Sequence, residues 1–148
     1  IYEPMGAVGL NGKVTYDKPT GLILAGLSGS PKYSGEGGQQ FTETQVYLTM
    51  ARMAPRLLYQ RLKRGRWVDV LITHAPPRDV NDRPDQAHRG FKAYRTFVKL
   101  FKPRYLLHGH IHLYDRNEPW QATLGETRVI NVYPYQKLDL DFEKPGVP

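Results

Sequence analysis

Three histidines lie within five residues, in the stretch His108-Gly109-His110-Ile111-His112, directly after the apolar run Tyr105-Leu106-Leu107. A short apolar run that ends in Gly-His is typical of a buried strand that passes into a tight loop. In an extended backbone, side chains two positions apart point to the same side, so His110 and His112 are expected to reach one cavity. Because imidazole suits Zn, Cu, Fe or Ni, the stretch predicts a metal site at the end of a strand.

A fourth histidine, His74, ends another apolar run, Val68-Asp69-Val70-Leu71-Ile72-Thr73. Between the two runs, residues 89–101 have the apolar spacing of a helix. A strand, helix and strand in this order form a right-handed crossover with parallel strands, so both strand ends lie at one edge of the sheet. We therefore expect His74 to meet His110 and His112. Three neutral imidazoles alone would match a catalytic zinc site with one open position, where bound water has a pKa of roughly 7.

The sequence indicates the roles of the other polar residues near these strand ends less clearly. His108 is expected to play a structural or supporting role. Two interpretations of His88 stay open, a residue at the start of a helix and a group on the substrate side. Three acidic residues follow in a loop that could equally face solvent, and they show no obvious ligand spacing: Asp79, Asp82 and Asp85.

The pattern of the whole chain predicts one α/β domain over residues 1–148. Strands are expected at 13–16, 21–27, 68–73, 105–108, 120–124, 127–133 and 137–142, and helices after Thr42 and over 89–101. Strand and helix units come first and antiparallel strands follow, which predicts a mixed sheet with C-terminal antiparallel strands. Strand 21–27 is apolar almost throughout, as in a sheet covered on both faces.

The first helix has a clear start and an irregular middle. Thr42 and Gln45 form a capping box, and an apolar stripe follows at helical spacing. Pro55 interrupts this stripe, so we expect a kink or two abutting helices. The stripe consists of Val46, Met50, Met53 and Leu57.

Residues 28–38 form the most glycine-rich loop of the chain. A phosphate-cradling loop would be conceivable there. The loop has neither a Gly-Lys-Ser/Thr ending nor a Gly-x-Gly-x-x-Gly pattern, so the sequence gives this interpretation little support.

Charge and amino-acid composition indicate which partners and which kinds of site this protein can have. The 148 residues carry a formal charge of +7, which favours anionic partners such as phosphate esters or nucleic acid. The densest basic run, residues 52–66, is interpreted as the solvated face and C-terminal end of a helix. Without cysteine there is no disulfide and no thiolate metal site, and a cytoplasmic location is favoured. No apolar run is long enough for a membrane span.

Taken together, these motifs resemble the C-terminal half of the calcineurin-like metallophosphoesterases. The similar residues are His74 in Leu71-Ile72-Thr73-His74-Ala75-Pro76-Pro77, then Asp85, His88-Arg89-Gly90, Gly109-His110-Ile111-His112 and Val129-Ile130-Asn131-Val132-Tyr133. The resemblance covers roughly residues 21 to 142.

The resemblance implies part of a four-layer α/β/β/α sandwich and a phosphoesterase with two divalent metal ions (Mn, Fe, Zn or Ni). By position, His74 and His110 would bind one metal and His112 the other. His88 would be catalytic and Arg89 would bind the phosphate-ester substrate. The two ions would bind the phosphoryl group and activate a hydroxide for in-line attack.

Three family motifs are absent from this sequence: Asp-x-His, Gly-Asp-x-x-Asp and Gly-Asn-His-Asp/Glu. They would supply the remaining metal ligands, including the bridging aspartate. Because the chain also begins with Ile1, we expect it to be the C-terminal portion of a longer domain. Its partner would be the N-terminal half or a complementary chain, seated on an exposed apolar surface.

Two alternatives remain open at this stage. The domain could be catalytically incomplete and act as a basic module that binds phosphate ligands or nucleic acid. It could also be a hydrolase with a single zinc held by three histidines.

Overall fold

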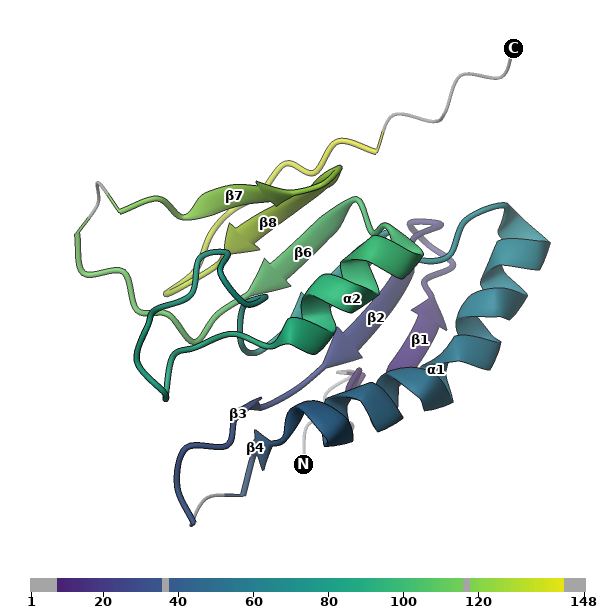
Figure 1. Ribbon diagram of the computed structural model, residues 1–148. Helices are drawn as coiled ribbons and strands as arrows, with labels where there is room; N and C mark the ends of the chain where they lie inside the picture. Colours follow the sequence, from purple (N-terminus) through teal and green to yellow (C-terminus); the bar gives the residue numbers. More distant parts are fainter. Residues whose placement is uncertain (1–7, 36–37, 116–117, 143–148) are drawn as a thin grey trace.

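A six-stranded mixed sheet forms the centre of the protein (Figure 1). The computed structural model describes residues 8–35, 38–115 and 118–142. The strands lie in the order β1-β2-β5-β6-β8-β7, with β2, β5, β6 and β8 parallel and the edge strands β1 and β7 antiparallel. The predicted mixed sheet and C-terminal hairpin are therefore confirmed. The strands are β1 (Lys13–Tyr16), β2 (Ile23–Leu27), β5 (Val70–Thr73), β6 (Tyr105–His108), β7 (Gln121–Leu124) and β8 (Thr127–Asn131).

Two helices, α1 (Glu43–Arg64) and α2 (Lys92–Phe101), cover one face of this sheet (Figure 1). The predicted capping box at the start of α1 is confirmed, because Thr42 and Gln45 bond to each other's backbone. The four predicted apolar residues of α1 are all buried in the core between helices and sheet. Neither of the two described helices combines the length and apolarity needed to cross a bilayer.

Helix α1 passes through Pro55 without a break, so the expected pair of abutting helices is wrong. Proline removes one backbone donor and crowds the carbonyl one turn earlier, that of Ala51. Both Pro55 and Ala51 are exposed, so water can bind the carbonyl that loses its partner. Long-range packing of the buried stripe keeps the helix continuous on its other side.

Helix α2 begins at Lys92, three residues after the predicted start at Arg89. Phe91 is still extended and its backbone pairs with the segment after β5: its N–H donates to the Pro76 carbonyl at 3.1 Å. This bridge holds the chain in a strand-like path and delays the helix. The helix then presents Ala93, Tyr94, Phe97 and Val98 to the core.

The predicted last strand, residues 137–142, is not a strand in the structure. The alternating burial is present, since Leu138, Leu140 and Phe142 pack on the sheet face opposite the helices. The backbone joins no ladder. Instead, the Tyr105 hydroxyl donates to the Asp141 carbonyl and accepts from the Asp141 N–H, both at 3.0 Å. The alternation of apolar residues over 137–142 therefore predicted their burial correctly. It did not predict strand pairing, because pairing requires a neighbouring strand.

The sheet face opposite the helices is only partly covered by these residues. Ile72 of β5 is 37% exposed, although its neighbours Val70 and Leu71 are buried. Leu24 and Leu107 are also only partly buried on this side. The described residues thus form one helix layer and one main sheet, which are two of the four layers of an α/β/β/α sandwich.

A further pair of short strands was not predicted. β3 (Ser30–Pro31) and β4 (Gln40–Phe41) pair in parallel and close the glycine-rich loop at its base. Two-residue strands leave no periodic signal in a sequence, so only the fold reveals them.

Two buried tyrosines provide a test of this core. The Tyr94 hydroxyl has no hydrogen-bond partner among the described residues, whereas the Tyr105 hydroxyl has two. We expect Tyr94→Phe to raise the free energy of unfolding by about 1 kcal/mol, because it removes a buried unpaired hydroxyl. Tyr105→Phe should lower it by a similar amount. Urea denaturation at pH 8 measures both, and equal effects of the two substitutions would contradict the assignment.

Burial, and secondarily the charge of Glu43, raise the pKa of Tyr94 above its ordinary value. Because the unfolded chain ionises this phenol near pH 10, its contribution to stability is complete below that pH and is lost as the pH rises further. Tyr94→Phe should therefore lose less stability than the wild type between pH 9 and 11. A parallel decline of both proteins would show that Tyr94 does not titrate in this way.

Candidate active site

His74 and His110 lie side by side at the carboxyl ends of β5 and β6, with ring centroids 4.7 Å apart. The two strands are parallel neighbours, as predicted, with Val70 opposite Tyr105. The loops that leave them are joined directly, because the Gly109 N–H donates to the His74 carbonyl at 3.1 Å. The predicted crossover therefore brings these two imidazoles to one place.

His110 has a left-handed backbone, with φ of 67°. This conformation is uncommon for a residue with a side chain and ends the extended path of β6. The alternation argument that grouped His110 with His112 therefore does not apply here. The His112 ring instead stacks on Tyr133 at 4.0 Å between centroids, and its Nδ1 lies 3.3 Å from the Tyr114 hydroxyl.

His88 is the third histidine that the structure brings to this place. Its ring centroid lies 5.2 Å from that of His110, and the His110 Nε2 bonds to the Ala87 carbonyl at 2.8 Å. Since α2 begins only at Lys92, His88 is not a helix-start residue. His88 instead lies in the loop before α2, beside His110.

Asp85 holds the His88 ring, with 2.8 Å between its Oδ1 and the His88 Nδ1. The hydrogen bond from His88 lowers the pKa of Asp85 below its ordinary value. Both side chains are about half exposed, so the pair opens to solvent. Arg89 follows on the same turn, is exposed, and donates to the Pro84 carbonyl at 3.1 Å.

His108 lies beneath this group and is 1% exposed. Burial lowers the pKa of His108 to about 4, so the ring is neutral near pH 7. Its Nδ1 lies 3.0 Å from the Gly109 carbonyl oxygen. This burial agrees with the supporting role expected for it.

The sequence indicated no separate role for Asn131, but the structure places this residue at the site. It ends β8, is 1% exposed, and donates from its amide to the Ile111 carbonyl at 2.8 Å. Its side-chain oxygen accepts from the Tyr133 N–H at 3.0 Å. Asn131 thus fixes the histidine loop and the segment that carries the ring stacked on His112.

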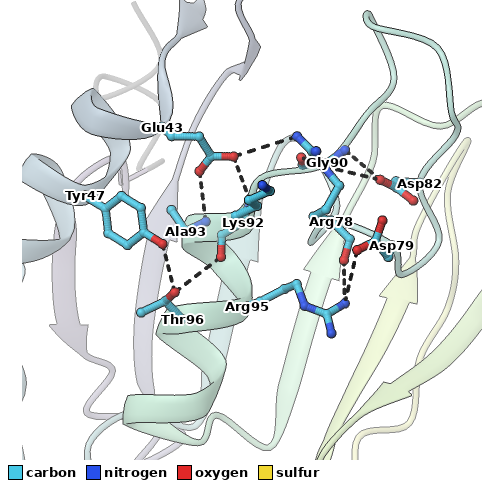
Figure 2. Close-up of polar contacts among 10 residues, drawn as sticks. All are labelled: Glu43, Tyr47, Arg78, Asp79, Asp82, Gly90, Lys92, Ala93, Arg95 and Thr96. Atoms are coloured by element: carbon cyan, nitrogen blue, oxygen red, sulfur yellow. Dashed lines mark hydrogen bonds and ion pairs between the residues drawn. The ribbon is translucent and has the colours of Figure 1, made fainter.

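The loop that carries His88 is held by a polar network that starts in α1 (Figure 2). The Glu43 carboxylate accepts from the Lys92 and Ala93 backbone N–H groups at 2.8 and 3.0 Å. It therefore caps α2, whose own N-cap residue Phe91 supplies no side-chain bond. The same carboxylate lies 3.8 Å from the Arg78 guanidinium.

Arg78 and Asp82 continue this network into the loop (Figure 2). Arg78 donates from Nε to the Gly90 carbonyl at 2.7 Å, and the Gly90 N–H donates to Asp82 at 2.9 Å. Arg95 of α2 donates to the Arg78 carbonyl at 2.7 Å. The two ends of the loop that carries His88 are thereby fixed together. Neither Glu43 nor Arg78 was expected at the site, because no local pattern links them to it.

The electrostatics at His74 favour a neutral ring. Burial, and secondarily the neighbouring His110, lower the pKa of His74. A neutral imidazole has a free lone pair, which is the form that binds a metal. Imidazole nitrogens such as those of His74 and His110 are donors that suit a divalent transition metal. Within the described ranges, however, no three or more His, Asp or Glu side chains are grouped closely enough to hold an ion.

Gly90 is the tightest point of this loop. A Cβ placed there would lie 2.5 Å from the Pro76 and Pro77 carbonyl oxygens, which are backbone atoms that cannot move aside. We expect Gly90→Ala to lower the free energy of unfolding by about 2 kcal/mol. Gly35→Ala is the matched control, because a Cβ there meets nothing within 4 Å. Equal urea midpoints for the two variants would contradict this packing.

Comparison with known proteins identifies a family that this chain resembles. A family model described as calcineurin-like phosphoesterase matches residues 8–114. A search of curated proteins finds no match. One solved crystal structure is similar with a TM-score of 0.54 and 18% identity, over 83% of this chain and 44% of its own. The crystal structure of TT1561 of Thermus thermophilus is similar with a TM-score of 0.51 and 13% identity, over 83% and 48%.

These two structures show a shared fold, and the chain spans less than half the length of either.

Proposed function

Because this chain belongs to the calcineurin-like phosphoesterase family, we propose that the protein hydrolyses phosphate mono- or diesters with two divalent metal ions. The observation that carries the proposal is the pair His74 and His110, side by side at the ends of adjacent parallel strands. Open α/β sheets place their ligand sites at such strand ends. The lowered pKa of His74 supports metal binding further, since it keeps the ring unprotonated.

Each histidine of the group has a proposed role. His74 and His110 bind one ion, and His112, on the loop after β6, binds the other. Bound divalent ions such as Mn, Fe, Zn or Ni would polarise the phosphoryl oxygens and lower the pKa of coordinated water. His108 and Asn131 hold the loop that presents these ligands.

His88 is the proposed proton donor to the departing alcohol. Asp85 bonds its Nδ1, which fixes the ring and leaves Nε2 for the substrate. Ring contact with His110 keeps His88 close to the proposed metal ligands. Arg89, exposed on the same turn, would bind a phosphate oxygen.

The remaining ligands are proposed to come from outside this chain, either from an N-terminal half of the domain or from a complementary chain. Three imidazoles carry no negative charge to balance two divalent ions, so carboxylates are needed. The partly exposed sheet face around Ile72 supports this proposal, because a covering layer would bury it.

Two substitutions separate metal binding from proton donation. In the full-length protein, His110→Gln should lose at least one bound ion, measured by mass spectrometry of metals. His88→Gln should keep the metal content and lower kcat by about 100-fold, because it removes the general acid. Hydrolysis of 4-nitrophenyl phosphate and bis(4-nitrophenyl) phosphate reports activity.

Chelation provides the control for this assay. Removal of metal should abolish hydrolysis, and one of the four candidate metals should restore it. One zinc per chain with retained activity would favour the single-zinc alternative. No hydrolysis, together with salt-sensitive binding to nucleic acid, would contradict the proposal and favour a basic binding module.

A further inference from the structure

A hollow of about 390 Å³ lies beside His74, between the glycine-rich loop and the end of β5. We propose that this pocket binds an uncharged, hydroxyl-rich part of the ester, such as a sugar or glycerol unit. The proposal rests on the function proposed above, since it assigns the alcohol portion of that substrate. The residues that matter to it are Ser28, Ser30, Tyr33, Gln39, Gln40 and His74.

The pocket wall is built by specific contacts. β3 and β4 pair at its base, where the Ser30 N–H donates to the Gln39 carbonyl at 3.0 Å. The Gln40 side-chain oxygen accepts from the Tyr33 and Ser34 backbone N–H groups at 3.0 and 3.1 Å. These bonds tie the described part of the loop to the segment that contains β4, and the hollow lies beside them.

Gly29 makes this arrangement possible. Its φ is +85°, and a Cβ there would lie 2.3 Å from the Phe41 ring. Only glycine can bring the chain this close to β4 in a left-handed conformation.

Five backbone N–H groups in the described part of the loop already bond within the protein, which disfavours a phosphate cradle. Such a cradle needs several backbone N–H groups directed at the anion. In this loop the N–H groups of Ser28, Ser30 and Lys32 bond to Asn11, Gln39 and Phe41, and two further N–H groups bond to Gln40. The described residues of the glycine-rich loop therefore form one side of the hollow.

The lining has the chemistry of an alcohol site. The Ser28 hydroxyl and the Gln39 amide that line the hollow can both donate and accept hydrogen bonds, as a sugar's hydroxyl groups require. Among the described lining residues no side chain is Lys, Arg, Asp or Glu, so a second phosphate would find no counter-charge there. The Tyr33 ring, 47% exposed, offers a flat apolar surface to the C–H face of a sugar.

His74 connects this pocket to the proposed reaction site. It lines the hollow, and its ring lies 4.7 Å from that of His110. A group in the pocket is therefore close enough to be joined to a phosphorus atom bound at the histidines. The volume of about 390 Å³ suits one sugar or nucleoside unit.

The test compares two esters in the full-length protein. If monoesters are hydrolysed, the pair is ribose 5-phosphate and phenyl phosphate; if diesters are, it is thymidine 5′-(4-nitrophenyl) phosphate and bis(4-nitrophenyl) phosphate. We expect Tyr33→Ala to reduce the ratio of kcat/KM, hydroxyl-rich over phenyl ester, by about tenfold through a higher KM. Tyr33→Phe, which keeps the ring, should stay within about threefold of the wild type.

Tyr59→Ala is the matched control, because Tyr59 is 48% exposed on the outer face of α1. It should leave the ratio unchanged. A Tyr33→Ala variant that keeps the ratio, or that lowers both esters equally, would overturn the pocket assignment.

Direct binding separates this inference from the proposed function. Saturation-transfer NMR with ribose should show binding to the wild type that Tyr33→Ala abolishes. That result supports the pocket even if neither ester is hydrolysed, in which case only the proposed function fails. Ribose that gives no signal with the wild type would overturn the pocket.

Discussion

The parallel pairing of β5 with β6 is the constraint on which the site depends. Its register puts the two strand ends level, so that the Gly109 N–H reaches the His74 carbonyl and the two rings meet. At the ends of these strands, burial lowers the pKa of His74 and, to about 4, that of His108. One backbone arrangement thus places His74 beside His110, and burial favours the neutral forms of His74 and His108.

The helix layer does more than cover the sheet. Glu43, in the first turn of α1, caps α2 across the layer and lies beside Arg78 at the start of the loop that carries His88. Because one carboxylate contacts both elements, a shift between the helices would also shift this loop. The packing of the core and the position of the proposed proton donor are therefore coupled.

Local sequence was sufficient where burial or capping alone decides structure. The apolar runs ending at Thr73 and His108 became β5 and β6, and Thr42 with Gln45 began α1 as predicted. Local sequence predicted the wrong structure where contact with a distant segment determines the backbone conformation. Residues 137–142 alternate correctly but pair with no strand, and Phe91 stays extended because the segment after β5 bonds to it.

By itself, the sequence determined the class of fold and the family resemblance, and it placed the histidines His74 and His110 at two strand ends. Tertiary structure alone decided which rings touch. His88 reaches His110 through a folded loop, and the His112 ring stacks on Tyr133. Asn131 and Glu43 act on segments far away in the chain. The physical reason is that apolar periodicity depends only on neighbouring residues and indicates which of them are buried. Whether side chains come together depends on contacts between segments that are distant in the sequence.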